Sequence, residues 1–201
     1  MLLSMNVIEL FSSIDGEGKR QGFLTTFLRL HDCNIRCSYC DTLYSYGPES
    51  TFESMSVQAV ADAIEQLENH RITITGGEPL LQEPAIIELI DELTRRNHRY
   101  DFNIETNGTI IPSFHRDNVW FTYDYKTPSS LAEDAMNLDI FKVATPADII
   151  KFVVGSMQDL DRMDEILKTY PTDAQIFVSP VWGNIEGATI CLLYTSPSPR
   201  D

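Results

Sequence analysis

The sequence has few cysteines and few basic residues, and each shortage excludes a class of protein. Four cysteines in 201 residues, three of them clustered, do not suit a disulfide framework, so we expect a reducing environment and a metal or cluster. Fifteen Lys and Arg stand against 30 Asp and Glu, which gives a formal net charge of −15. Nucleic-acid binding needs a basic patch to neutralise phosphates, and the sequence shows none.

Long apolar runs are also missing. Residues 1–6 lack the basic region and apolar core of a secretory signal, and no stretch is long enough for a membrane helix. We therefore expect a cytoplasmic protein with no membrane partner. A chain of this length can bury about 70% of its unfolded surface as one domain. We assign residues 1–190 to that domain and expect 191–201, which is Ser-Pro-rich and without periodicity, to be an irregular tail that is not native.

Short β-rich segments alternate with segments of helical periodicity. The expected strands are 6–11, 25–30, 72–75, 102–105, 119–123, 150–154 and 176–179. One expected helix follows Ser56, one follows Pro84 and one covers 157–168, whereas the connection between Thr106 and Asn118 is too short for a crossover helix. With the first strand at an edge, the order predicts an α/β fold, either an incomplete (β/α)6 TIM-like barrel or an open sheet.

Polar segments follow five of the expected strands. They are residues 33–40, 75–79, 105–108, 124–126 and 179–181. Parallel α/β folds collect their ligands at the C-terminal ends of the strands. We therefore expect these five segments to surround one site.

The first of these segments holds Cys33, Cys37 and Cys40 within eight residues. Three thiolates can hold three corners of a cubane iron–sulfur cluster and leave one iron open to another ligand. A structural zinc site usually has four ligands in two separated pairs, and the sequence has no second pair, although His31 is a possible fourth ligand. We therefore favour a cluster over zinc.

The spacing Cys33-xxx-Cys37-x-Tyr39-Cys40, followed later by Gly76-Gly77-Glu78-Pro79, resembles the radical S-adenosylmethionine (SAM) enzymes. In that family the open iron binds the amino and carboxylate groups of SAM, and an electron from the cluster cleaves SAM to a 5′-deoxyadenosyl radical. The resemblance implies a [4Fe–4S] cluster on the three cysteines. It also implies SAM contacts from Tyr39, Cys40, Asp41, Gly76, Gly77, Glu78, Asp124, Tyr125 and Lys126.

Five further segments, in order, resemble the 7-carboxy-7-deazaguanine synthases of queuosine and 7-deazapurine biosynthesis. They are residues 13–18, 27–30, 40–42, 105–109 and 124–130. The resemblance spans about residues 6–190 and implies a lyase that converts 6-carboxy-5,6,7,8-tetrahydropterin to 7-carboxy-7-deazaguanine with loss of ammonia. It implies Mg²⁺ at Thr42 and substrate contacts from Ile14, Asp15, Gly16, Glu17, Arg29 and Thr75.

Two positions depart from this family. Asp15 stands where many members have Gln, and Asp124-Tyr125 replaces the common Ser-Pro before Lys126. The family further implies an external electron donor such as flavodoxin, and a homodimer.

Two other functions stay open. One is a radical SAM activase that forms a glycyl radical on a partner protein, and the other is an iron–sulfur electron carrier without catalysis. Arg29 and Glu17 favour the synthase, because a cation and a carboxylate suit the carboxylate and the donor edge of a pterin. The sequence assigns no acid–base residue to the loss of ammonia.

Overall fold

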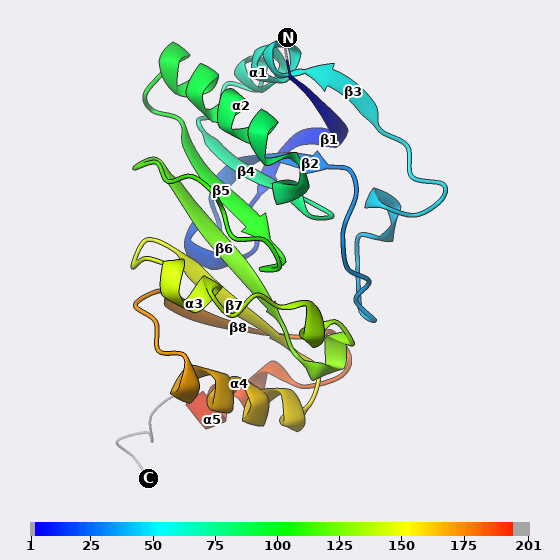
Figure 1. Ribbon diagram of the computed structural model, residues 1–201, viewed down its shortest axis with the longest axis vertical. Helices are drawn as coiled ribbons and strands as arrows, with labels where there is room; N and C mark the ends of the chain where they lie inside the picture. Colours follow the sequence, from blue (N-terminus) through cyan, green and yellow to red (C-terminus); the bar gives the residue numbers. More distant parts are fainter. Residues whose placement is uncertain (1–2, 195–201) are drawn as a thin grey trace.

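The computed structural model describes residues 3–194, and within them eight strands form one sheet in the order β3-β1-β2-β4-β5-β6-β7-β8 (Figure 1). The strands are β1 (Ser4–Ile14), β2 (Leu24–Leu30), β3 (Glu53–Ser56), β4 (Arg71–Gly76), β5 (Asp101–Thr106), β6 (Val119–Lys126), β7 (Ile149–Val154) and β8 (Gln175–Pro180). Strands β3 and β8 are the two edges, so the barrel is not closed.

The six parallel strands of the predicted incomplete barrel are present, namely β2 and β4 to β8. Strand β1 runs antiparallel to β2, but it does not lie at the edge as the sequence suggested. Strand β3 covers its other side, with Ser4 opposite Ser56 and Val7 opposite Glu53. The four residues of β3 are too few and too polar to show the alternation that marks a strand in a sequence.

The three predicted helices are present as α1 (Val57–Gln66), α2 (Glu83–Arg96) and α4 (Met157–Thr169). Two short helices were not predicted, α3 (Ile140–Val143) and α5 (Gly187–Tyr194). Helix α5 includes the first four residues of the expected irregular tail, and residues 195–201 lie outside the described part. As predicted, no α-helix joins β5 to β6 in the described chain. None of the helices within residues 3–194 combines the length and the hydropathy needed to cross a bilayer.

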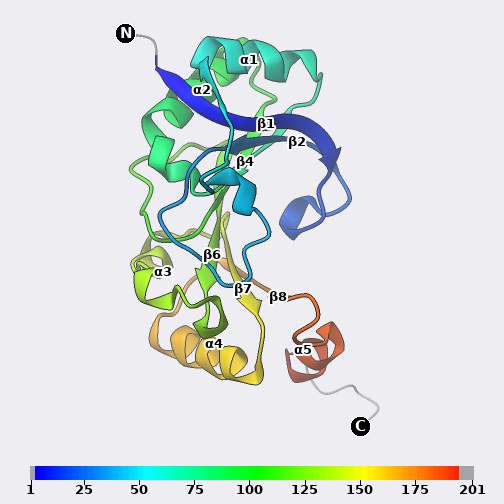
Figure 2. The same cartoon turned by 90° about the vertical axis from the view of Figure 1, so that its right-hand side faces the viewer.

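The two faces of the parallel sheet differ in chemistry because side chains alternate along each strand. Outward side chains such as Ile74, Ile104 and Phe152 are fully buried in one core with the helix residues Ile64 and Ile86. The inward face is largely polar, and Figure 2 shows the β1–β2 connection and the long loop after β2 lying in front of it. Its fully or nearly buried polar residues include Thr25, Thr73, Thr75, Asn103 and Thr122. The inward face is therefore the place for a ligand site.

The β1–β2 connection, residues 15–23, covers the inward face near the N-terminal ends of the parallel strands. The buried Arg20 donates to the Ile72 carbonyl at 2.7 Å and to Asp101 Oδ2 at 2.7 Å. Its guanidinium also lies 4.4 Å from the centre of the Trp120 ring. These contacts reach from β4 to β6, so the connection is fixed to three adjacent strands in the middle of the sheet.

Candidate functional site

A cavity of about 650 Å³ opens on the inward face at the C-terminal ends of the parallel strands. All five polar segments singled out in the sequence contribute to its wall, because parallel strands end at the same edge. The lining from these segments includes Cys33, Cys37, Cys40, Thr75, Gly76, Gly77, Glu105, Asn107, Asp124, Lys126 and Ser179. The β1–β2 connection adds Asp15, Gly16 and Glu17, and β2 adds Arg29.

The cysteine loop crosses from β2 to the far side of the cavity. Ser38 anchors it there, because its backbone N–H donates to the Ser130 carbonyl at 2.9 Å and its hydroxyl to the Ser129 carbonyl at 2.6 Å. Nearer to β2, the Asn107 side-chain amide lies 3.8 Å from Cys33 Sγ. These contacts hold the three thiols toward the cavity.

The donor set of this loop fits a cubane cluster. All three thiols are free and partly buried, and they line one cavity. Burial raises the pKa of Cys33 and of Cys37, so their thiolates need a nearby cation, which cluster iron supplies. In the described chain no three His, Cys, Asp or Glu side chains converge on a single ion. A cubane does not require such convergence, because each thiolate binds a different iron.

The turn after β4 requires glycine. A Cβ on Gly77 would lie 2.0 Å from the Asp32 carbonyl oxygen, and one on Gly76 would lie 2.3 Å from the Leu30 carbonyl oxygen. Because these residues have no side chain, the turn packs directly against the end of β2, beside the cysteine loop. The backbone of both glycines lines the cavity.

Glu78 lies behind this wall and does not line the cavity. Its buried carboxylate accepts from the Leu80 backbone N–H at 2.9 Å, the Thr106 hydroxyl at 2.9 Å and the Asn107 backbone N–H at 2.7 Å. Burial raises its pKa, and these donors partly offset the rise. Glu78 therefore joins the turn after β4 to the turn after β5.

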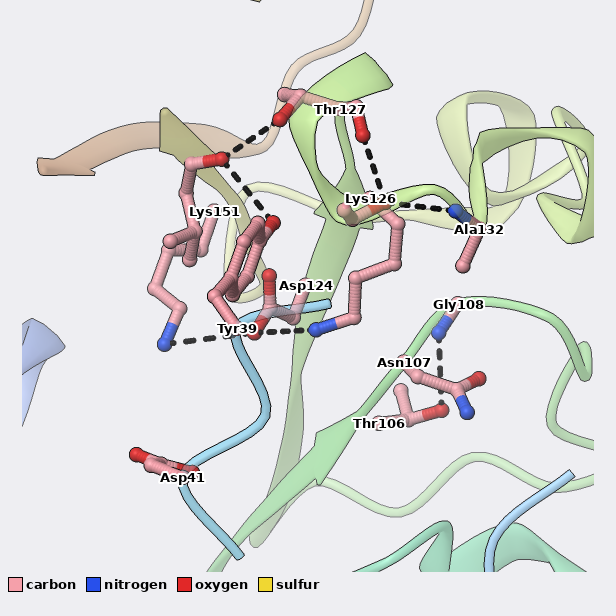
Figure 3. Close-up of polar contacts among 12 residues, drawn as sticks. Tyr39, Asp41, Thr106, Asn107, Gly108, Asp124, Lys126, Thr127, Ala132 and Lys151 are labelled. Atoms are coloured by element: carbon pink, nitrogen blue, oxygen red, sulfur yellow. Dashed lines mark hydrogen bonds and ion pairs between the residues drawn. The ribbon is translucent and has the colours of Figure 1, made fainter. Parts of the chain in front are cut away.

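A chain of alternating charges crosses the opposite wall of the cavity. Figure 3 shows Asp124 between two ammonium groups, with its Oδ2 at 3.0 Å from Lys126 Nζ and 3.7 Å from Lys151 Nζ. Lys151 also pairs with Glu17 Oε2 at 2.8 Å. Burial alone would lower the pKa of Lys151, but Asp124, Glu17 and Glu105 more than offset this and leave it raised. Lys151 is therefore a fixed ammonium group inside the cavity.

Besides Glu78, two residues assigned from the resemblance do not line the cavity. Tyr125 lies between Asp124 and Lys126 on β6, so the alternation of a strand turns it to the opposite face, where its hydroxyl donates to Glu133 at 2.9 Å. Ile14 ends β1 and is 60% exposed.

Arg29 and Thr42 do line the cavity, and each is held by a neighbouring carboxylate. Arg29 Nε donates to Glu9 Oε1 at 2.6 Å, and the guanidinium lies 5.8 Å from the centre of the Tyr44 ring. The Thr42 hydroxyl donates to Asp41 Oδ1 at 2.6 Å. This hydroxyl–carboxylate pair is the kind of hard oxygen donor that Mg²⁺ prefers.

Sequence reasoning gave no role to several residues of the wall. Lys151 is the clearest case, and its signal is a single charged residue inside the apolar strand 149–154. Glu105 lies in a segment that the sequence did single out, but without a role of its own. Trp182 follows β8 and is 97% exposed at the cavity rim.

The sequence profile of the radical SAM superfamily matches residues 29–151, which contain the cysteine loop and the Gly-Gly-Glu turn. The chain belongs to this superfamily, whose members use a [4Fe–4S] cluster and SAM. The predicted cluster and SAM are thus confirmed as cofactors of the family.

Within the superfamily, curated relatives identify a narrower group. The chain is 36% identical over 193 residues to a 7-carboxy-7-deazaguanine synthase of Clostridium acetobutylicum, covering 94% of this chain and 86% of the relative. It is 37% identical over 182 residues to the synthase of Methanospirillum hungatei, covering 89% and 74%. The chain therefore belongs to the 7-carboxy-7-deazaguanine synthase family, which supports the synthase interpretation over the activase and the electron carrier.

The fold agrees with this assignment. The crystal structure of QueE from Escherichia coli superimposes with a TM-score of 0.73 at 22% sequence identity, covering 94% of this chain and 89% of the other. At this identity the likeness concerns the fold, including the sheet that places the five polar segments together.

Proposed function

We propose that this chain converts 6-carboxy-5,6,7,8-tetrahydropterin to 7-carboxy-7-deazaguanine and ammonia. The observation that carries the proposal is the 36% identity to a 7-carboxy-7-deazaguanine synthase along 94% of the chain. The cavity supports it, because thiols, a glycine turn, cations and carboxylates face one space at the strand ends. Product and ammonia together contain the atoms of the substrate, so the conversion needs no net oxidant.

We propose that Cys33, Cys37 and Cys40 hold the cluster. When bound, the cluster and SAM supply the radical that takes a hydrogen atom from the substrate. The residues proposed for the SAM site are Tyr39, Cys40, Asp41, Gly76, Gly77, Glu78, Asp124, Tyr125 and Lys126. Of these, the glycines admit a ligand close to the backbone, Lys126 and Asp124 supply opposite charges, and Tyr125 can contribute only through its backbone. Glu78 acts by fixing the turn, because its carboxylate is already bonded within the protein.

The opposite part of the cavity is proposed to bind the pterin. The residues are Ile14, Asp15, Gly16, Glu17, Arg29 and Thr75, of which Ile14 is the one outside the cavity wall. The bond from Arg29 Nε to Glu9 holds the guanidinium in the wall, where it can bind the substrate carboxylate. Thr42, with Asp41 beside it, is proposed to hold Mg²⁺ near that carboxylate.

The test is product formation under anaerobic conditions. Reconstituted protein is incubated with SAM, a reductant, Mg²⁺ and the carboxy-tetrahydropterin, and the products are analysed by mass spectrometry. We expect a product lighter than the substrate by one ammonia, in a yield that falls when Mg²⁺ is removed. Cleavage of SAM without this product would refute the proposed reaction and leave the superfamily assignment intact.

A matched pair of cysteine variants controls this experiment. Cys40→Ala should lose both the visible absorbance of the cluster and the product, because it removes one proposed iron ligand. Cys191→Ala should retain both, because Cys191 is exposed on α5 and does not line the cavity. Equal loss in the two variants would contradict the proposed cluster site.

A further inference from the structure

Two side chains of opposite charge, Asp32 and Arg36, are bonded to the backbone of Cys33. Asp32 Oδ1 accepts from the Cys33 N–H at 2.8 Å. Arg36 Nη1 donates to the carbonyls of Cys33 and Ile35, at 2.7 Å in each case. Both side chains belong to exposed residues that do not line the cavity. They therefore approach this cysteine from outside the space proposed for SAM and substrate.

Tyr46 fixes the position of the Arg36 guanidinium. The guanidinium carbon lies 4.2 Å from the centre of the Tyr46 ring, a distance at which the ring face attracts a cation. Burial raises the pKa of Tyr46 to about 12, so the phenol is neutral at pH 7 and adds no negative charge. Arg36 is thus held between the Cys33 carbonyl and an uncharged ring.

The positive charge of Arg36 is not neutralised by the protein. Its contacts within residues 3–194 are two carbonyls and one ring, and none is with a carboxylate. Lys126, on the other side of the cavity, differs because it pairs with Asp124 at 3.0 Å. Burial raises the pKa of the Cys33 thiol, and Arg36 acts against this rise. Arg36 therefore favours negative charge at Cys33.

Asp32 is fixed by its backbone in a conformation that suits few residues. Its φ is 79°, in the left-handed region that Asp and Asn tolerate better than other residues with a side chain. Its N–H donates to the Ser45 carbonyl at 2.9 Å, and its carbonyl accepts from the Glu78 N–H at 2.8 Å. Asp32→Asn can therefore remove the charge and leave the conformation in place.

Reduction makes the cluster more negative by one charge. One electron enters from an external donor, no bond forms or breaks, and no proton is required. Nearby charge and solvent exposure set the potential of an iron–sulfur cluster. A fixed positive charge beside a cysteine ligand stabilises the reduced state and raises the potential, and a fixed negative charge lowers it.

We infer that Arg36 and Asp32 set the reduction potential of the cluster from behind Cys33, with Arg36 favouring electron entry and Asp32 opposing it. Both are positioning residues that act through the cysteine loop. The inference rests on the proposed cluster site, and it is independent of which substrate the cavity takes.

The test is a redox titration of the reconstituted protein, followed by electron paramagnetic resonance without SAM or substrate. At a fixed ambient potential, Arg36→Gln should lower the ratio of reduced to oxidised cluster by about three- to tenfold, and Asp32→Asn should raise it. A tenfold change is about 59 mV for a one-electron couple. Arg36→Lys keeps the charge but loses the planar fork, so it should lie between wild type and Arg36→Gln.

Ionic strength separates a charge effect from a structural one. The Debye length falls from about 10 Å at 0.1 M to about 3 Å at 1 M salt, so the shifts of both exposed variants should shrink over this range. A role confined to holding the loop would lower the iron content without this salt dependence. Iron and visible absorbance are therefore measured for every variant.

Arg99→Gln is the matched control, because Arg99 is an exposed arginine that contacts Asn97 and does not line the cavity. It should leave the potential unchanged. The inference is overturned if Arg36→Gln and Asp32→Asn shift the potential in the same direction, if neither shifts it, or if Arg99→Gln shifts it equally. Should Arg36→Gln fail to hold a cluster, the directions of Asp32→Asn and Arg36→Lys decide the matter. Product formation is scored separately, so failure here is distinguishable from failure of the proposed reaction.

Discussion

The cationic side chains on the inward face of the sheet are each paired with a carboxylate. Arg20, Lys126 and Lys151 all lie inside the sheet, and each is paired with a carboxylate. Arg20 differs from the two lysines because it lies below the cavity and contacts only parts of the protein. Its contribution is therefore to stability, whereas the lysines also face the ligand space.

Arg20→Ala tests this role. The substitution removes the bonds to Ile72 and Asp101 and the contact with Trp120, so it should lower the free energy of unfolding by about 3 kcal/mol. Urea unfolding followed by circular dichroism measures the change. Arg99→Ala, at an exposed arginine, should stay within about 0.5 kcal/mol of wild type. A similar loss in both variants would contradict the role of Arg20.

Elements meet at the cavity through tight turns and through side chains that bond to the backbone of those turns. The turn after β4 is followed by the short helix η3 (Pro79–Gln82) and packs on the backbone of the cysteine loop. The N-terminus of α4 is similarly joined to the short helix η4 (Pro128–Ser130), because Asp159 accepts from the Ser129 backbone N–H at 2.9 Å and the Gly155 backbone N–H at 2.6 Å. Ser129 in turn accepts from Ser38 of the cysteine loop.

Gly77→Ala should destabilise the protein through the first of these turns. Its Cβ would lie 2.0 Å from a carbonyl oxygen, so the backbone must shift at a cost of roughly 1–3 kcal/mol or more. Gly16→Ala is the matched control, since a Cβ there meets nothing within 4 Å. Urea midpoints of the two variants are compared with wild type. A Gly77→Ala protein as stable as Gly16→Ala would show that the turn is not tightly packed.

Asp159→Asn should change how stability depends on pH. Burial would raise the pKa of Asp159, but hydrogen bonds from Ser129 and Gly155 outweigh it and hold the pKa below its usual range. A depressed pKa contributes stability above the unfolded value of about 3.9, and this contribution is lost as pH falls through the folded value. At pH 7 the variant should therefore be less stable by roughly 1–3 kcal/mol, with a smaller difference at pH 3.

Urea unfolding at pH 7, 5 and 3 measures this difference. Asp161→Asn, an exposed aspartate on the same helix, should follow the wild-type curve. A stability difference for Asp159→Asn that is constant from pH 7 to pH 3 would disprove the linkage.

The whole molecule combines an open sheet with a strongly negative charge. Its two edges, β3 and β8, do not meet, and the β1–β2 connection is fixed to the inward face through Arg20 and through Lys19, which donates to the Ala147 carbonyl. The formal charge of −15 is spread over a chain of 201 residues. Such an excess of like charge opposes the compact state more than the exposed ion pairs favour it.

Salt should therefore stabilise the folded chain. The Debye length falls from about 30 Å at 0.01 M to about 8 Å at 0.15 M ionic strength, which screens repulsion between distant carboxylates. We expect a higher urea midpoint at 0.15 M than at 0.01 M NaCl at pH 7.5, with an unchanged m-value. A lower midpoint at 0.15 M would mean that attractive surface pairs dominate instead.

The sequence predicted the parallel strands and the longer helices, because each has a periodic apolar pattern of sufficient length. It did not predict β3, α3 or α5, which are too short or too weakly patterned to be recognised. The sequence also did not distinguish an incomplete barrel from an open sheet. Whether the two edges pair depends on the twist accumulated over all the strands, which no local pattern records.

At the site, the sequence by itself determined the chemistry, because three clustered thiols, a glycine turn and polar residues after five of the strands are all local patterns. The tertiary structure alone decided which of these groups face one another. Lys151 lies 134 positions from Glu17 yet pairs with it, and strand register places Glu105 beside Thr122. Sequence spacing has no information on such contacts, because they arise only when strands distant along the chain align side by side.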